Sequence, residues 1–161
     1  MKHGLLIFLV AVLAGCATKA PVQTLRFHEQ VAGNLPASHV RMVVVPSTRQ
    51  HLAVDPEPTL SERDVVSAKL EPSAGGDAIL LKFDAHGANL LAEMTTRLRG
   101  RSLVVLVNDR PVAAVLIEHA IASGELLLTG DLTDEETQTL VDSLNKVTKR
   151  KPESGTPKPE P

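Results

Sequence analysis

The stretch that decides the fold is residues 78–88, Ala-Ile-Leu-Leu-Lys-Phe-Asp-Ala-His-Gly-Ala. Its first half, up to Phe83, is short and almost entirely apolar, which predicts a central β-strand. Asp84 follows directly and can cap a helix, because its carboxylate accepts hydrogen bonds from the free N–H groups of a first turn. We therefore expect a helix that runs to Leu98 and is stopped by Gly100. Its buried stripe is expected to consist of Ala88, Leu91, Thr95 and Leu98.

After this helix, two apolar runs flank a tight turn. Residues 103–107 and 112–116 favour strands, and Asn108-Asp109 between them tolerates the left-handed backbone of a hairpin turn. The two strands are therefore expected to be antiparallel neighbours. A further strand is predicted over residues 126–129.

A second helix is predicted to begin at the capping box Thr-Asp-Glu-Glu, residues 133–136. Its acidic start and basic end both suit the helix dipole. Gln138 and Asn145 are expected on its opposite or flanking faces, where replacement by alanine changes stability by only about half a kcal/mol. Its buried stripe is expected to consist of Leu140, Val141, Leu144 and Val147.

Upstream of the central strand, two more strands and a short helix are predicted. Residues 40–45 favour a strand that ends before proline, and residues 51–54 favour a weaker one. At residues 60–65, Leu-Ser-Glu-Arg-Asp-Val, Ser61 is expected to cap a short helix while Asp64 reaches back to the cap. The first and last residues of this segment, Leu60 and Val65, form a hydrophobic staple. The whole pattern predicts one small α+β domain, mainly an antiparallel sheet with two principal helices packed on one face.

The first sixteen residues have the features of an export signal. Lys2 is basic, residues 5–13 are apolar, and Leu-Ala-Gly-Cys closes the segment at Cys16, the only cysteine of the chain. The apolar run is too short for an ordinary membrane-spanning helix. The segment resembles the lipobox of bacterial lipoproteins, in which the thiol is lipidated and the signal is removed before the cysteine. Because Ala17 rather than Asp follows, the lipoprotein pattern points to the outer membrane, with the protein facing the periplasm. The alternative is an ordinary secretory signal or uncleaved anchor with an incidental cysteine.

This interpretation divides the chain into four parts. Residues 1–15 are the signal peptide, 16–24 the tether, 25–147 the folded domain and 148–161 a disordered tail rich in proline, lysine and glutamate. Loss of Lys2 reduces the 17 basic residues to 16 against 19 acidic ones, a formal charge of −3. Since the chain has no clustered basic face and no Trp or Tyr, nucleic acid is not an expected partner.

Several motifs in the folded part occur together in one known family. They are residues 79–88, Thr95, Gly100-Arg101-Ser102-Leu103, Asn108-Asp109, Val112-Ala113-Ala114, Ile121, Gly124, Thr129-Gly130 and Thr133-Asp134-Glu135-Glu136. With them the chain resembles the head subdomain of the first periplasmic domain of SecD or SecDF, a membrane component of protein export. Residues 58–65 are similar to the segment that precedes that head. The resemblance implies the same α+β fold and a module that contacts emerging polypeptide. Two features depart from the family: Val115 stands where proline is usual, and Asn108-Asp109 lacks the usual turn glycine.

Catalytic and metal motifs are missing from the sequence. The serines lie outside any Gly-x-Ser-x-Gly elbow, and Ser61 is better explained as a cap. The pair Gly75-Gly76 lacks the Lys-Ser/Thr of a phosphate loop, and Gly87 lies inside a helix pattern. Glu118 and His119 adjoin at a strand or its exit, so their side chains point to opposite faces. The histidines of the mature chain, none in a His-Glu-x-x-His motif, are His28, His39, His51, His86 and His119. The acidic residues that lack calcium-loop spacing are Asp131, Asp134, Glu135 and Glu136.

Two functions of different classes remain. The favoured one is a non-enzymatic binding or accessory module, lipid-anchored in the membrane through Cys16, for exported polypeptides, export components or another envelope protein. The alternative is an envelope hydrolase or metal-dependent enzyme whose site is assembled from scattered histidines and acidic residues. No catalytic, cofactor or metal residue is assigned, and Cys16 is the one modification site expected. A structural spacer is a third interpretation, which the single compact domain and the short linkers make less attractive.

Overall fold

Three antiparallel sheets and two α-helices form the part of the chain that the computed structural model describes, residues 23–32, 35–73 and 76–148. Each strand pairs only with antiparallel neighbours. The four-stranded sheet has the order β4 (Leu60–Ser61), β1 (Leu25–Glu29), β7 (Ser102–Val107) and β8 (Arg110–Leu116). The three-stranded sheet has the order β5 (Val65–Ser73), β6 (Gly76–Phe83) and β9 (Glu125–Leu128). The two-stranded sheet consists of β2 (Arg41–Val45) and β3 (Gln50–Val54). The helices are α1 (Ala85–Arg97) and α2 (Asp134–Thr148), with short 3-10 helices at Ala37–His39 and Glu62–Asp64.

One core joins the two larger sheets and both helices. Phe27 on β1 and Phe83 on β6 meet edge to face, with ring centroids 5.7 Å apart, and so connect the two sheets. Leu91 of α1 and Leu140 of α2 are fully buried in the same cluster. Burial of each such side chain contributes about 1.5 to 3 kcal/mol.

The α+β class, the antiparallel strands and the two principal helices predicted from the sequence are confirmed, and the strands divide into three sheets.

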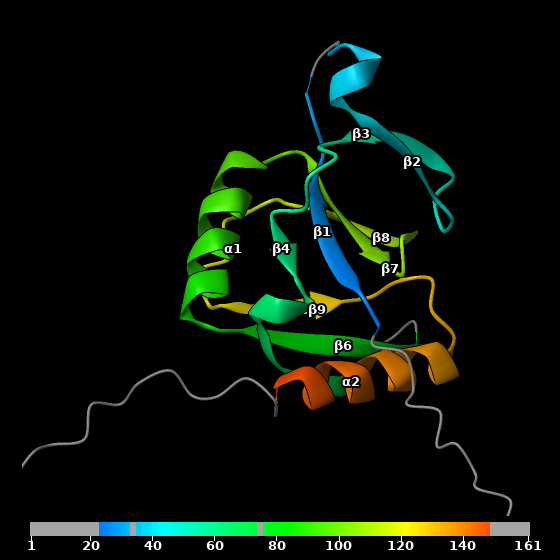
Figure 1. Cartoon of the computed structure of the whole chain (residues 1–161), viewed down its shortest axis with the longest axis vertical. Coiled ribbons are helices and arrows are strands. Elements are labelled where there is room, and N and C mark those ends of the chain that lie inside the picture. Colours follow the sequence, from blue (N-terminus) through cyan, green and yellow to red (C-terminus); the bar gives the residue numbers. More distant parts are fainter. Residues whose placement is uncertain (1–22, 33–34, 74–75, 149–161) are drawn as a thin grey trace, which may run out of the picture.

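A smaller cluster holds the β2–β3 hairpin on the four-stranded sheet. Val43 and Val54 of the hairpin pack with Val104 and Leu106 of β7. The side chains of β7 are buried on both faces because the main core covers one face and the hairpin covers the other. Figure 1 shows the hairpin at the end of the domain opposite α2.

The local signals around the central strand are confirmed. Asp84 caps α1, accepting a hydrogen bond from the N–H of Gly87 at 2.8 Å. Leu98 is the C-cap, and Gly100 follows with a φ of 76°, in the left-handed region that glycine adopts without strain. The turn between β7 and β8 has φ values of 49° at Asn108 and 63° at Asp109, as a tight hairpin requires.

Two longer strands, β1 and β5, and the two-residue strand β4 were missed, and the short helix is smaller than expected. The capping box of Ser61 and Asp64 is present, but it opens only the single 3-10 turn Glu62–Asp64. The chain then enters β5, whose alternation is obscured by a bulge between Val65 and Ser67 and by its largely exposed second half. The other longer strand that was missed, β1, is a five-residue segment with no turn signal of its own.

Asn145 lies on a flanking face of α2, as expected, but it is not the unconstrained position that was expected there. Its side chain is half-buried and lies against the outer edge of β5, where its Nδ2 donates to the carbonyl of Ala68 at 2.9 Å. The N–H of Ala68 in turn donates to Asn145 Oδ1 at 3.0 Å. Thr148 extends this contact by donating to the carbonyl of Val65 at 3.1 Å. These three bonds cover an otherwise open strand edge, a role that helix periodicity does not reveal.

Candidate functional site

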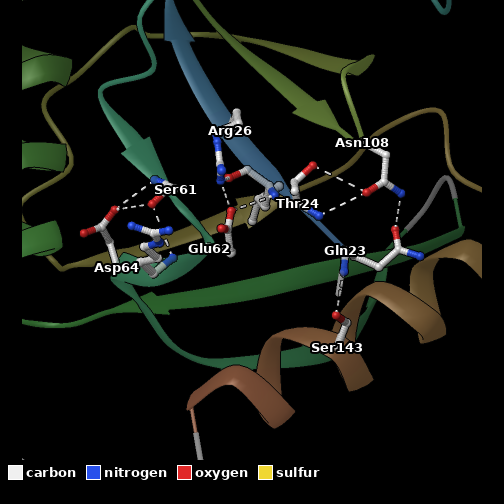
Figure 2. A network of polar contacts seen from close by, with 10 residues as sticks. Gln23, Thr24, Arg26, Ser61, Glu62, Asp64, Asn108 and Ser143 are labelled. Atoms are coloured by element: carbon white, nitrogen blue, oxygen red, sulfur yellow. Dashed lines mark hydrogen bonds and ion pairs between the residues drawn. The ribbon is translucent and has the colours of Figure 1, made fainter. Parts of the chain in front are cut away.

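The start of the described chain is held by a cluster of hydrogen bonds centred on Asn108. The N–H of Thr24 donates to Asn108 Oδ1 at 3.0 Å, and the N–H of Asn108 donates to the carbonyl of Thr24 at 3.1 Å. Asn108 Nδ2 donates to Gln23 Oε1 at 2.6 Å, while the N–H of Gln23 donates to Ser143 Oγ of α2 at 2.9 Å (Figure 2). The side chain of Asn108 therefore gives the hairpin turn a second role, which is to bind the start of the described chain.

A buried carboxylate secures the next two residues. Glu62 is 7% exposed. Its Oε2 accepts a hydrogen bond from the N–H of Leu25 at 3.1 Å and forms an ion pair with Arg26. Glu62 is held in place by the 3-10 turn, in which the N–H of Ser61 donates to Asp64 Oδ2 at 2.9 Å (Figure 2). We call the contacts of residues 23–26 with Glu62, Asn108 and Ser143 the N-terminal clamp. The clamp fixes where the preceding chain leaves the domain.

A cavity of about 260 Å³ opens beside the clamp. Arg110 lines it, with one guanidinium nitrogen 2.6 Å from Glu136 Oε1 and the other 3.0 Å from the carbonyl of Asp131. The backbone N–H of Thr133 donates to Glu136, and this bond, followed by the charge of Arg110, holds the pKa of Glu136 below its usual value. Glu136 is therefore ionised at neutral pH and unsuited to act as a general acid. The cavity is lined by Gln23, Val107, Asn108, Arg110, Leu132 and Glu136.

The structure scatters the histidines. His28 is buried on β1, with its Nδ1 2.8 Å from the carbonyl of Asp55, whereas the other four are exposed. Glu118 and His119 are both exposed beyond the end of β8. Within the described ranges, no three His, Cys, Asp or Glu side chains gather where they could hold a metal ion. Of the acidic residues at the start of α2, Glu136 completes the capping box with Thr133. Cys16 lies outside the described residues.

An exposed apolar strand lies at the far end of the domain. The side chains of Val43 and Val45 on β2 point inward, whereas Met42 is 62% and Val44 is 47% exposed. β2 is also an edge strand, since its only neighbour in the described chain is β3. Sequence reasoning identified this segment as a strand but missed its exposed edge, because the position of a strand in a sheet depends on distant partners. The one local signal is a run of Met and Val between Arg41 and Pro46.

In the part of the chain that the structure describes, no helix is both long and apolar enough to cross a membrane. Comparison with known proteins gives one family and several solved structures. The family described as SecDF, P1 head subdomain, matches residues 39–146. No curated protein matches the sequence significantly.

Two of the similar structures contain SecDF. One, reported as the structure and function of a membrane component SecDF that enhances protein export, has a TM-score of 0.57 at 19% identity; the alignment covers 76% of this chain and 61% of that chain. The other, SecDF in a super-membrane-facing form, has a TM-score of 0.56 at 18% identity; the alignment covers 76% of this chain and 18% of that chain. The chain thus spans only part of either protein, and the likeness at this identity is one of fold.

Proposed function

Because this chain belongs to the family of SecDF P1 head subdomains, we propose that it is a non-enzymatic accessory module of protein export in the cell envelope. The observation that carries the proposal is the family match over residues 39–146, which also confirms the resemblance inferred from the sequence. SecDF itself is described as a membrane component that enhances protein export. The part shared with SecDF is the head subdomain. The proposed role is therefore contact with exported polypeptide or with another export component.

We further propose that the module is a lipoprotein, anchored through Cys16 and facing the periplasm from the outer membrane. The support is the short apolar signal ending in Leu-Ala-Gly-Cys, and the Ala at position 17. Acyl chains on one residue provide durable attachment because each buried CH₂ contributes about 0.8 kcal/mol. A membrane attachment of this kind requires no membrane-spanning helix in the domain itself.

Replacement of Cys16 by serine is expected to abolish acylation, because a hydroxyl cannot replace the thiol in forming the thioether. The Cys16→Ser protein should then leave the membrane fraction or accumulate with its signal uncut. Metabolic labelling with a radioactive fatty acid, followed by fractionation of the envelope, measures both effects. Cys16→Ala provides a second variant without a nucleophile, and normal labelling of either protein would refute the lipoprotein assignment.

Crosslinking in intact envelopes, followed by purification of the full-length protein, tests the export role. We expect export-channel components or unfolded exported chains among the crosslinked partners. A matched sample in which export is blocked before crosslinking should lose the exported chains. If both samples yield only unrelated envelope proteins, the proposed export role is wrong, and the relationship to SecDF is one of ancestry alone.

A further inference from the structure

The outer edge of β2 carries backbone groups that point away from the rest of the domain. Met42 pairs with Ala53 of β3, and the carbonyl of Ala53 accepts a hydrogen bond from Val31 on the far side of β3, at 2.9 Å. The backbone groups of Ala53 therefore point away from β2. In an antiparallel ladder, when the backbone groups of one residue point away from the partner strand, those of the residue directly opposite do so too. The same direction recurs at every second residue along each strand. The N–H and C=O groups of Met42 and Val44 thus point to the side of β2 where no strand of the described chain is hydrogen-bonded to it.

The exposed side chains lie on the same two residues. Met42 and Val44 alternate with the buried Val43 and Val45, so they share the outward face of the hairpin. Their direct partners on β3 are Ala53 and His51, of which Ala53 is half-buried and small. Two open pairs of backbone groups and two apolar side chains therefore occur together on a strand held firmly against β7 by its other face. This combination is the one that peptide binding by strand addition uses.

We propose that the edge of β2 binds an extended, apolar polypeptide segment with acidic flanking residues, which adds to the hairpin as a third strand. The proposal rests on the export role proposed above and assigns the polypeptide contact to a particular edge. Main-chain hydrogen bonds to Met42 and Val44 would give affinity for extended chains with little regard to sequence. Their side chains would favour apolar residues at alternate positions of the bound segment.

The preference for acidic flanks follows from the charges at the two ends of β2. Arg41 begins the strand, with 38% of its side chain exposed, and forms an ion pair with Asp109 at 3.6 Å. Arg49 ends the connecting turn and is exposed. The N–H of Arg49 donates to the carbonyl of Val45 at 2.8 Å, so Arg49 lies beside the end of β2. A segment bound along β2 would therefore have an arginine near each of its ends, which favours acidic flanking residues.

Titration of the purified full chain with a fluorescent peptide, Glu-Thr-Val-Thr-Ile-Thr-Val-Glu, tests the proposal. Val44→Pro should weaken binding about tenfold or more, because proline removes the N–H that pairs with the peptide. Val44→Thr, the matched control, keeps the N–H and the branched shape and should bind within about threefold of the unchanged protein. Thermal unfolding checks that Val44→Pro folds, as expected for proline where the N–H faces solvent on an edge strand.

The peptide itself offers a test that is independent of protein folding. N-methylation of the peptide at alternate residues on one edge should abolish binding to the unchanged protein, and N-methylation on its other edge should leave binding intact. Replacement of both terminal Glu by Lys should weaken binding, and added salt should reduce the difference. Equal binding of both methylated peptides, or unchanged binding by a folded Val44→Pro, would overturn the β2 site. If Val44→Pro still crosslinks to exported chains in the envelope, the site is wrong while the export role stands.

Discussion

Replacement of Leu144 by alanine is expected to lower the free energy of unfolding by about 2 to 5 kcal/mol, as is usual when a buried leucine leaves a cavity. Leu144 is 1% exposed and packs, together with Leu140, in the core shared by both large sheets. Leu140→Ala should have a loss in the same range. Urea unfolding followed by circular dichroism measures the change, and a stable small domain has only about 5 to 15 kcal/mol to lose.

The matched control is Gln138→Ala on the same helix. Gln138 is exposed, and its side chain donates a hydrogen bond to Asp142 one turn later, at 3.1 Å, so the loss for Gln138→Ala should stay within about half a kcal/mol. Asn145 is unsuitable as a second control, because it bonds both backbone groups of Ala68. Equal losses for Leu144→Ala and Gln138→Ala would show that the helix presents a different face to the core.

The second large effect is expected for Arg26→Met. This change leaves the carboxylate of Glu62 buried without its cation, which typically costs about 3 kcal/mol or more. Methionine preserves much of the length and apolar stem of arginine, so the loss reports on charge rather than on packing. The unfolding free energy in urea is again the measurement.

A double variant separates charge from structure at this pair. Glu62→Gln keeps an oxygen that can accept the N–H of Leu25 but removes the negative charge. Arg26→Met combined with Glu62→Gln should therefore be more stable than Arg26→Met alone. If the double variant is as unstable as the single one, the uncompensated charge is not the cause of the loss.

The parts of the fold that were predictable are those set by neighbouring residues. Asp84 caps the helix that follows it, and Asn108-Asp109 turns the hairpin between its flanking strands, because both effects act over a few residues. β1 was missed since its place depends on residues far along the chain: Leu25 bonds to Glu62 and pairs with Val107.

The site shows the same division. The capping box of Ser61 and Asp64 was predictable because the two residues are three positions apart in the sequence. Its consequence, the ion pair between Glu62 and Arg26, was not predicted. The free edge of β2 is likewise a property of the assembled sheets. Periodicity shows that Met42 and Val44 lie in a strand, but only the tertiary arrangement shows that nothing in the described chain pairs with their side of it.

The N-terminal clamp also sets an orientation relative to the bilayer. Between the proposed lipid at Cys16 and the clamp at Gln23 lie too few residues to reach farther than about 25 Å even when fully extended. The clamped end of the domain would thus stay close to the membrane that holds it. β1 runs from that end to the β2–β3 hairpin (Figure 1), so the hairpin would lie at the end of the domain farthest from the anchoring membrane. From the outer membrane, it would be directed across the periplasm, toward chains that arrive from the inner one.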